Sequence, residues 1–166
     1  MVCARNSLTH LTIDAFPASY RSLKDPILGV ILRNLQLVHL SLKNNKLKDL
    51  GCQFGRYLAQ SKTLETLDVS GTHLCAKAIE SICRALSTDQ SRMKNLYMAR
   101  VQELNFEGVY EIGRMLETNQ TLRVLDLSRN YQAMTQGIIV VMGRLEKNAT
   151  LQCLKVNNIV ASDCTF

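Results

Sequence analysis

Two histidines and two aspartates recur at related spacings in the sequence. The interval from Asp68 to Asp126 is twice the interval from His10 to His39. A pair of imidazoles is the beginning of a metal site or of a pH-sensitive switch, and paired carboxylates can act as general acid and base. The spacing therefore raises the question of which structural unit brings these side chains together.

Neither pair comes with the other groups that its chemistry requires. No third metal ligand continues the histidine series, because Thr66 stands at the next equivalent position. The sequence contains no G-x-S-x-G motif, no phosphate-binding loop and no H-E-x-x-H motif. We therefore predict no catalytic residues, no metal and no cofactor, and we expect the two histidine rings to stack on neighbouring strands.

Cysteines and glycosylation motifs favour structural roles. The six cysteines, at positions 3, 52, 75, 83, 153 and 164, include no C-x-x-C pair. Cys52, Cys75 and Cys83 fall in expected helices, where a small buried hydrophobe fits the pattern, so we expect reduced thiols, as in the cytosol. Asn119 and Asn148 begin N-x-T motifs, but the interval between them equals that between the two histidines. This recurrence at one point of a repeat favours a structural role.

One apolar phrase, Leu-x-x-Leu-x-Leu, recurs six times and explains these spacings. Its copies begin near residues 8, 37, 64, 93, 122 and 151, at a constant interval except for one slightly shorter step from the second copy to the third. A tandem repeat of this length is one strand-plus-helix unit that buries its apolar face only against its neighbours. The copies are Leu8-x-x-Leu11-x-Ile13, Leu37-x-x-Leu40-x-Leu42, Leu64-x-x-Leu67-x-Val69, Met93-x-x-Leu96-x-Met98, Leu122-x-x-Leu125-x-Leu127 and Leu151-x-x-Leu154-x-Val156.

The periodicity predicts a curved α/β body. Alternation within each phrase indicates a short strand whose first, fourth and sixth residues point inward, and apolar residues at i, i+3 and i+4 between the phrases indicate helices. Strand, helix and strand in one sheet require parallel strands with right-handed crossovers. Parallel strands lie about 4.8 Å apart whereas packed helices need about 8 to 10 Å, so we expect strands on the concave face and helices on the convex face. The inward helix residues would be Leu50, Phe54 and Leu58; Ile79, Ile82 and Leu86; Val109, Ile112, Met115 and Leu116; and Ile138, Val141, Met142 and Leu145.

The phrases resemble the consensus of the leucine-rich repeat family. The likeness is clearest from Leu122 to Asn130 and from Leu37 to Leu47. The 29-residue period, with Gly51, Gly108 and Gly137 near helix starts, resembles the ribonuclease-inhibitor-type subclass. This resemblance implies a leucine-rich repeat solenoid, a horseshoe-shaped arc found in intracellular proteins that bind other proteins.

The resemblance also implies a role for an asparagine at the ninth position of each repeat. In the family its side chain bonds the backbone of the neighbouring loop. Asn45 and Asn130 occupy this position, whereas the other repeats have Phe16, Thr72, Val101 and Ile159.

We predict that residues 1–166 form a single leucine-rich repeat domain of about five and a half repeats. The first strand begins by about residue 8, and the sixth phrase is not followed by its helix. Terminal repeats normally need a protected outer face, and neither end has an evident polar cap. Two alternatives stay open: a fragment of a longer protein, or ends that contact another chain in an end-to-end or larger assembly.

Strands in register would align equivalent positions of the phrase across the concave face. Tyr97 then comes between Asp68 and Asp126 in the fifth position. Those two aspartates would be two strands, about 9.6 Å, apart, which without a cleft does not favour acid-base catalysis. An outward tyrosine among arginines is typical of an interaction hot spot, although mixed charges also keep an exposed sheet solvated. We predict a partner-binding site formed by Tyr97, Asp68, Asp126, Lys94, Arg123, Arg100, Arg129 and Lys155.

The net charge of +6 and the pI near 9.1 favour either a solvated surface or an acidic protein partner. Dispersed cations with only five Tyr and four Phe do not make a stacking platform for nucleic acid. No stretch approaches the roughly 20 apolar residues of a membrane helix, and the first residues do not form a secretory signal. We expect a cytoplasmic protein without membrane or nucleic-acid binding.

These observations predict a non-enzymatic protein-protein interaction module, a scaffold or regulatory subunit that acts through its concave face. The resemblance leaves two alternatives: a Ran-type GTPase-activating or other GTPase-regulating protein, and a structural component of the cilium or cytoskeleton. Ribonuclease inhibition is disfavoured, because that target is basic and this chain is basic too.

Overall fold

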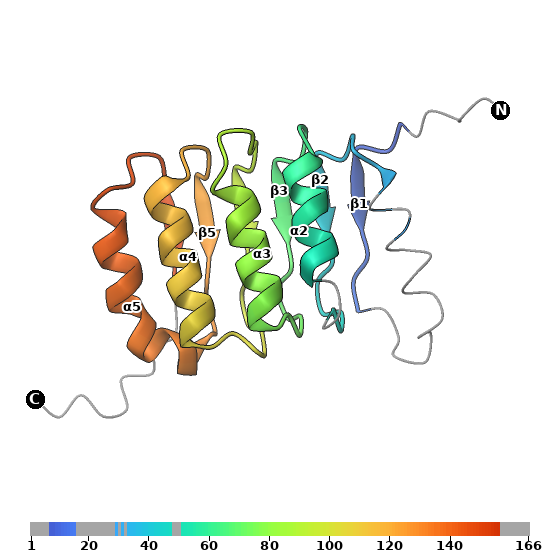
Figure 1. Cartoon of the computed structure of the whole chain (residues 1–166). Helices are drawn as coiled ribbons and strands as arrows, with labels where there is room; N and C mark the ends of the chain where they lie inside the picture. The colour runs from blue at the N-terminus through green and yellow to red at the C-terminus, as the bar shows by residue number, and fades with distance from the viewer. Residues whose placement is uncertain (1–6, 16–28, 30, 32, 48–50, 157–166) are drawn as a thin grey trace, which may run out of the picture.

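The computed structural model describes residues 7–15, 29, 31, 33–47 and 51–156 (Figure 1). Short strands alternate with helices along these ranges, as the repeat predicts. Leu50, one of the expected inward helix residues, lies outside the described residues. In chain order the elements are β1 (His10–Thr12), β2 (His39–Ser41), α2 (Gly51–Gln60), β3 (Thr66–Asp68), α3 (Ala76–Leu86), β4 (Asn95–Tyr97), α4 (Phe106–Thr118), β5 (Val124–Asp126), α5 (Tyr131–Leu145) and β6 (Cys153–Lys155).

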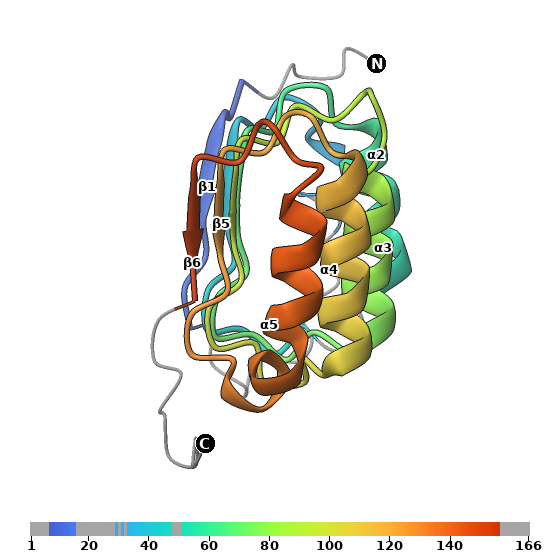
Figure 2. The ribbon, with the colours of Figure 1, turned by 90° about the vertical axis from the view of Figure 1, so that its left-hand side faces the viewer.

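The strands form one six-stranded parallel sheet in the described part of the chain. Its order is β1-β2-β3-β4-β5-β6, so each strand pairs with the strand of the next repeat. The fourth residues of the phrases align across the whole sheet, from Leu11 through Leu40 and Leu67 to Leu96, Leu125 and Leu154. Figure 2 shows the repeats superimposed along the stacking direction, with the sheet on one side and the helices on the other. The predicted register is confirmed.

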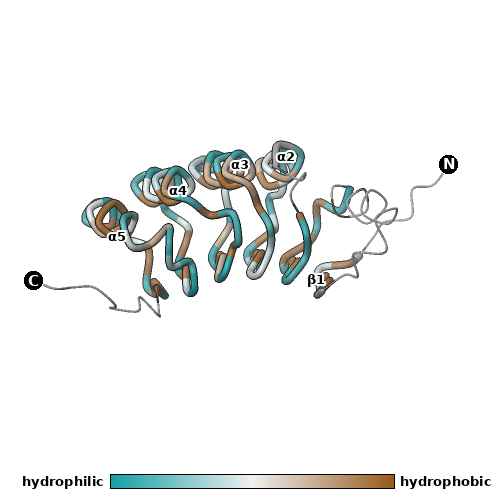
Figure 3. The backbone as a smooth tube through the Cα atoms, turned by 90° about the horizontal axis from the view of Figure 1, so that it is seen from below, coloured by the Kyte–Doolittle hydropathy of each residue, from teal (hydrophilic) through white to brown (hydrophobic). Residues whose placement is uncertain are grey.

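The helices cover one side of the sheet, and the whole stack curves. Each of α2, α3 and α4 packs against the helix that follows it. Figure 3 shows the helices on the outer side of the arc and the strands on its inner side. The fold is therefore the predicted α/β solenoid, with a concave face of strands and a convex face of helices.

The core lies between the two layers. In the second to fifth repeats, the first, fourth and sixth residues of the phrase are all buried, as predicted. The inward residues of α3 and α4 are buried as well. The prediction was wrong for Met142 on α5, which is 54% exposed. Leu8, in the first phrase, is also exposed. Both residues belong to the outer repeats, where one neighbouring layer fewer covers the apolar positions.

No helix within the described ranges is both long enough and apolar enough to span a lipid bilayer.

Candidate partner-binding site on the concave face

Tyr97 stands near the middle of the concave face, where the register predicts it. It pairs with Asp68 on β3 and with Asp126 on β5, and Asp126 in turn pairs with Lys155 on β6. The Tyr97 side chain is partly exposed, and the Lys155 ammonium lies over its ring, 5.9 Å from the centroid. The structure thus brings together an aromatic ring, a carboxylate and a cation from three successive repeats.

The two aspartates beside Tyr97 are not equivalent. The Asp68 side chain is only 13% exposed and lies 3.4 Å from the Lys43 ammonium, measured from Oδ2 to Nζ. Each aspartate also accepts a hydrogen bond from the backbone N–H two residues later, Asp68 from Ser70 at 3.0 Å and Asp126 from Ser128 at 2.9 Å. These bonds hold the turn after each strand. Asp68 is therefore mainly a turn residue, whereas Asp126 keeps a half-exposed side chain.

The predicted cations of the second position are exposed and have partners within the protein. Lys94 Nζ lies 2.7 Å from Glu65 Oε1 on the neighbouring repeat. Arg123 donates a hydrogen bond of 3.0 Å to the carbonyl of Thr150. Exposed pairs of this kind contribute little to stability, so both side chains can exchange these partners for those of another protein.

The eighth position of the repeat adopts a left-handed backbone in every described copy. The φ angles are 47° at Ala15, 57° at Asn44, 69° at Gly71, 51° at Arg100 and 61° at Arg129. Glycine and asparagine suit this conformation. A side chain such as that of arginine costs about 1 to 2 kcal/mol there, because its Cβ crowds the following carbonyl. Two of the predicted site residues, Arg100 and Arg129, therefore occupy a backbone position that disfavours them.

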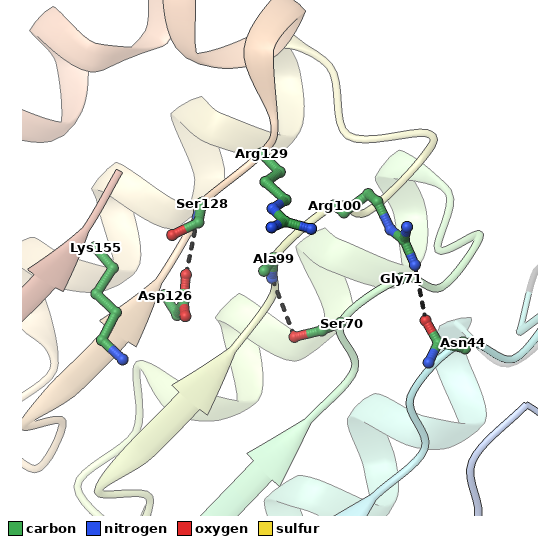
Figure 4. Close-up of a pocket in the computed structure, with 9 residues that line it drawn as sticks. All are labelled: Asn44, Ser70, Gly71, Ala99, Arg100, Asp126, Ser128, Arg129 and Lys155. Atoms are coloured by element: carbon green, nitrogen blue, oxygen red, sulfur yellow. Dashed lines mark hydrogen bonds between the residues drawn. The ribbon is translucent and has the colours of Figure 1, made fainter. Parts of the chain in front are cut away.

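The turns after the strands surround an open hollow of about 550 Å³ on the concave side. Arg100 donates a hydrogen bond of 3.0 Å to Asn44 Oδ1, and Asn44 donates one of 2.8 Å to Asp14. Arg129 has no hydrogen bond or ion pair with any residue in the described ranges. The lining residues, drawn in Figure 4, are Asn44, Ser70, Gly71, Ala99, Arg100, Asp126, Ser128, Arg129 and Lys155.

The hollow includes residues that the sequence analysis did not assign to the site. Ser70, Ala99 and Ser128 occupy the seventh position of three repeats, and Asn44 and Gly71 occupy the eighth. The available signal was the same column alignment that identified Arg100 and Arg129. Ser70, Gly71, Ala99 and Ser128 carry no charge or aromatic ring that would indicate a binding site; they leave space and form turns.

His10 and His39 stack as predicted, with ring centroids 5.9 Å apart and an interplanar angle of 17°. His10 Nδ1 is 3.0 Å from the Thr9 hydroxyl. Among the described residues no three His, Cys, Asp or Glu side chains converge as metal ligands would. The histidine pair is a surface feature of the first two repeats, away from the hollow.

Three thiols lie within the described residues. Cys75, Cys83 and Cys153 form no disulfide with one another, and Cys83 is buried in α3. Burial raises the pKa of the Cys83 thiol far above its ordinary value, which makes it an unreactive core residue. The side chain of Cys52 and the residues Cys3 and Cys164 lie outside what the structure describes.

Comparison with known proteins supports the fold from both sequence and structure. The chain is 33% identical to the mouse NACHT, LRR and PYD domains-containing protein 4C, over 60% of this chain and 10% of that protein. It is 31% identical to the pig ribonuclease inhibitor, over 68% of this chain and 24% of that protein. A solved structure of leiomodin-1 actin-binding site 2 superposes with a TM-score of 0.63 at 16% identity, covering 84% of this chain and 81% of that chain. No family model matches the sequence.

The chain has the leucine-rich repeat fold, and its sequence is similar to that of proteins that contain leucine-rich repeats. It spans between 10% and 27% of the length of the curated relatives that it matches.

The leucine-rich repeats are joined by buried asparagines, as the resemblance implies. Asn130 donates hydrogen bonds of 2.8 Å to the Met98 carbonyl and 2.9 Å to the Leu127 carbonyl, and it accepts one of 2.8 Å from the Val101 N–H. Asn45 donates to the Ile13 carbonyl of the previous repeat at 2.8 Å. These side chains satisfy backbone groups that the turns leave unpaired.

A second series of asparagines joins the leucine-rich repeats at the other end of the strands. Asn119 is 1% exposed. It donates a hydrogen bond of 2.6 Å to the Leu86 carbonyl and accepts one of 2.7 Å from the Leu122 N–H. Asn148 repeats this pattern with Leu116 and Leu151. The structural role predicted for the two N-x-T asparagines is confirmed.

Proposed function

We propose that this chain is a non-enzymatic protein-binding module that serves a scaffold or regulatory assembly through its concave face. The main support is the position of Tyr97, a partly exposed aromatic residue near the middle of the sheet. Half-exposed aromatic residues among cations are enriched where proteins bind one another. The predicted single domain of about five and a half repeats and its cytoplasmic location belong to the same proposal.

Two similar proteins are named for functions that involve other proteins. One is an inhibitor of ribonuclease, and the other is an actin-binding site. Protein binding is therefore common to relatives found by sequence and by structure. The net charge of +6 favours an acidic partner for this chain and disfavours a basic one.

Capture of partners from a native lysate tests the proposal. We expect Tyr97→Ala combined with Arg123→Ala to reduce the captured protein about tenfold or more, the effect typical of a hot-spot residue. Tyr110→Ala is the matched control, because Tyr110 is 41% exposed on α4 of the convex face. Mass spectrometry of the captured proteins identifies the partner. Equal capture by both variants would place the binding site elsewhere, provided that both proteins remain folded at the assay temperature.

The cytoskeletal alternative has one specific observation in its favour, the likeness to leiomodin-1 actin-binding site 2. At 16% identity this likeness is one of fold alone. Actin is therefore only the second candidate partner, after an acidic protein that binds the concave face. Co-sedimentation with actin filaments, together with binding of labelled actin monomers, tests it. The GTPase-regulating alternative stays a prediction, and a turnover assay with small GTPases tests that one.

A further inference from the structure

We propose that the hollow on the concave face binds carboxylate side chains from an acidic peptide segment of the partner. This inference rests on the proposed protein-binding function and specifies the chemistry of the partner. Its anchors are Arg129 and Arg100, with Lys155 beside them.

The charges that line the hollow favour an anion. Three cations, Arg100, Arg129 and Lys155, come from three successive repeats, and Asp126 is the carboxylate among the lining residues. Arg129 has no protein partner for its charge in the described ranges. Figure 4 shows its side chain reaching over Ala99 toward Arg100. Both arginines line the hollow, and each guanidinium group carries five N–H donors, more than its contacts within the described residues use.

The backbone of these turns points to the same conclusion. Both arginines have positive φ angles, at a repeat position where Asn44 and Gly71 show the residue types that this conformation favours. Residues held in such conformations cluster where their side chains are needed for function. Contact of Arg100 and Arg129 with the same ligand would account for the presence of two arginines in strained backbone positions around one hollow.

Side chains rather than backbone amides must recognise the ligand. The Gly71 N–H bonds the Ala99 carbonyl at 2.8 Å, and the Arg100 N–H bonds the Ser128 carbonyl at 2.9 Å. These two amides are therefore not available to a ligand, unlike those of the free amide cluster that typically holds a phosphate group. A planar guanidinium instead matches a carboxylate with two parallel hydrogen bonds.

The hollow also suits a peptide better than a single small anion. Its volume of about 550 Å³ is within the range of sites that enclose much larger groups than one carboxylate. The Ser70 hydroxyl accepts a hydrogen bond from the Ala99 N–H at 3.2 Å, so its own proton remains available to a ligand. Tyr97 stands beside Asp126, a lining residue, and offers an aromatic surface to a neighbouring residue of the peptide.

A fluorescently labelled hexaglutamate peptide is the probe, with hexaglutamine and inorganic phosphate as comparison ligands. We expect the unmodified protein to bind hexaglutamate more tightly than either comparison ligand. Arg129→Gln should weaken that binding about tenfold, the effect of losing one charge-assisted pair of hydrogen bonds. Arg92→Gln removes the same charge from an exposed residue at the other end of the repeat and should change binding less than about twofold. Equal weakening by the two variants, or equal binding of phosphate, would overturn the proposal.

Replacement of Arg129 by asparagine separates its role in binding from its role in the turn. A purely structural arginine would not give a rise in stability together with a loss of binding. Arg129→Asn should raise the melting temperature by about 2 to 4 °C, because the left-handed turn is relieved, while hexaglutamate binding falls. Ala15→Asn is the matched control at the same repeat position. It should raise the melting temperature similarly and leave binding unchanged. If Arg129→Asn keeps full binding, the arginine is not an anchor.

The outcome is separable from that of the proposed function. If Tyr97→Ala with Arg123→Ala abolishes partner capture but hexaglutamate does not bind, the concave face binds protein without this carboxylate site. If hexaglutamate binds through Arg129 but partner capture is insensitive to Tyr97 and Arg123, the anion site stands and the proposed role of Tyr97 fails.

Discussion

Lys155 on β6 lies over the ring of Tyr97 on β4, although β5 separates the two strands. The ammonium is 5.9 Å from the ring centroid, within the distance of a cation-π interaction. Asp126, the residue between them in register, remains half-exposed. One contact therefore connects the last described strand with the middle of the concave face.

We expect this contact to appear as coupling between the two side chains. A double-mutant cycle with Tyr97→Leu and Lys155→Met should give an interaction free energy of about 0.5 to 1 kcal/mol, the range of exposed cation-π pairs. Urea denaturation of the four proteins measures it. Additive effects of the two substitutions would show that the pair is not formed in solution.

Asn130→Ala should destabilise the protein by about 2 to 4 kcal/mol. The substitution leaves three buried backbone groups, in Met98, Leu127 and Val101, without their hydrogen-bond partner. Asn95→Ala is the control, because half-exposed Asn95 donates one bond of 3.0 Å to the Thr66 hydroxyl; it should cost under about 1 kcal/mol. Chemical denaturation compares the two, and similar losses would contradict a special role for the ninth position.

Two glycines of α5 should respond oppositely to the same substitution. A Cβ on Gly137 would come within 2.9 Å of Val109 Cβ on α4, whereas a Cβ on Gly143 would meet nothing within 4 Å. We expect Gly137→Ala to destabilise the protein by about 1 to 3 kcal/mol through overpacking. Gly143→Ala should stabilise it by up to about 1 kcal/mol through helix propensity. Thermal melting of both variants is the measurement, and stabilisation by Gly137→Ala would mean that α4 and α5 are not this close.

Glu117 makes stability depend on pH in the acid range. Hydrogen bonds from Lys147 and then Arg144 lower the pKa of its carboxyl below the ordinary value. A carboxyl whose pKa is lower in the folded state stabilises the protein above the unfolded pKa, and this contribution disappears as pH falls through the folded pKa. Glu117→Gln should therefore flatten the loss of stability between about pH 5 and pH 3.

Two lysine variants, measured in the same pH series, test whether the effect comes from the ion pair of Glu117. Lys147→Gln should also flatten the slope, because Lys147 Nζ lies 2.5 Å from Glu117 Oε1. Lys62→Gln removes an exposed lysine in the turn before β3 and should keep the original slope. An unchanged slope in Glu117→Gln would show that these ion pairs do not persist in solution.

The sequence by itself determined the architecture and the register. Leucines such as Leu40, Leu67 and Leu96 recur at nearly constant spacing, and each must be buried against the same position of the next repeat. This local rule places Tyr97 between Asp68 and Asp126 and stacks His10 on His39, without any knowledge of long-range contacts. The resemblance to the family rests on the same periodicity, and the asparagine bonds are what that resemblance implies.

Only the tertiary structure decided how the polar side chains share their partners. Asp68 and Asp126 occupy one column, yet Lys43 and the turn largely bury Asp68 while Asp126 borders the hollow. The position of Arg129, which has no polar partner among the described residues, and the contact of Lys155 with Tyr97 likewise depend on competition among neighbours from several repeats. Burial of leucine is dictated by its own repeat, because the hydrophobic effect is non-directional. Hydrogen bonds and ion pairs are directional and short-ranged, so their partners are set only when the repeats have stacked.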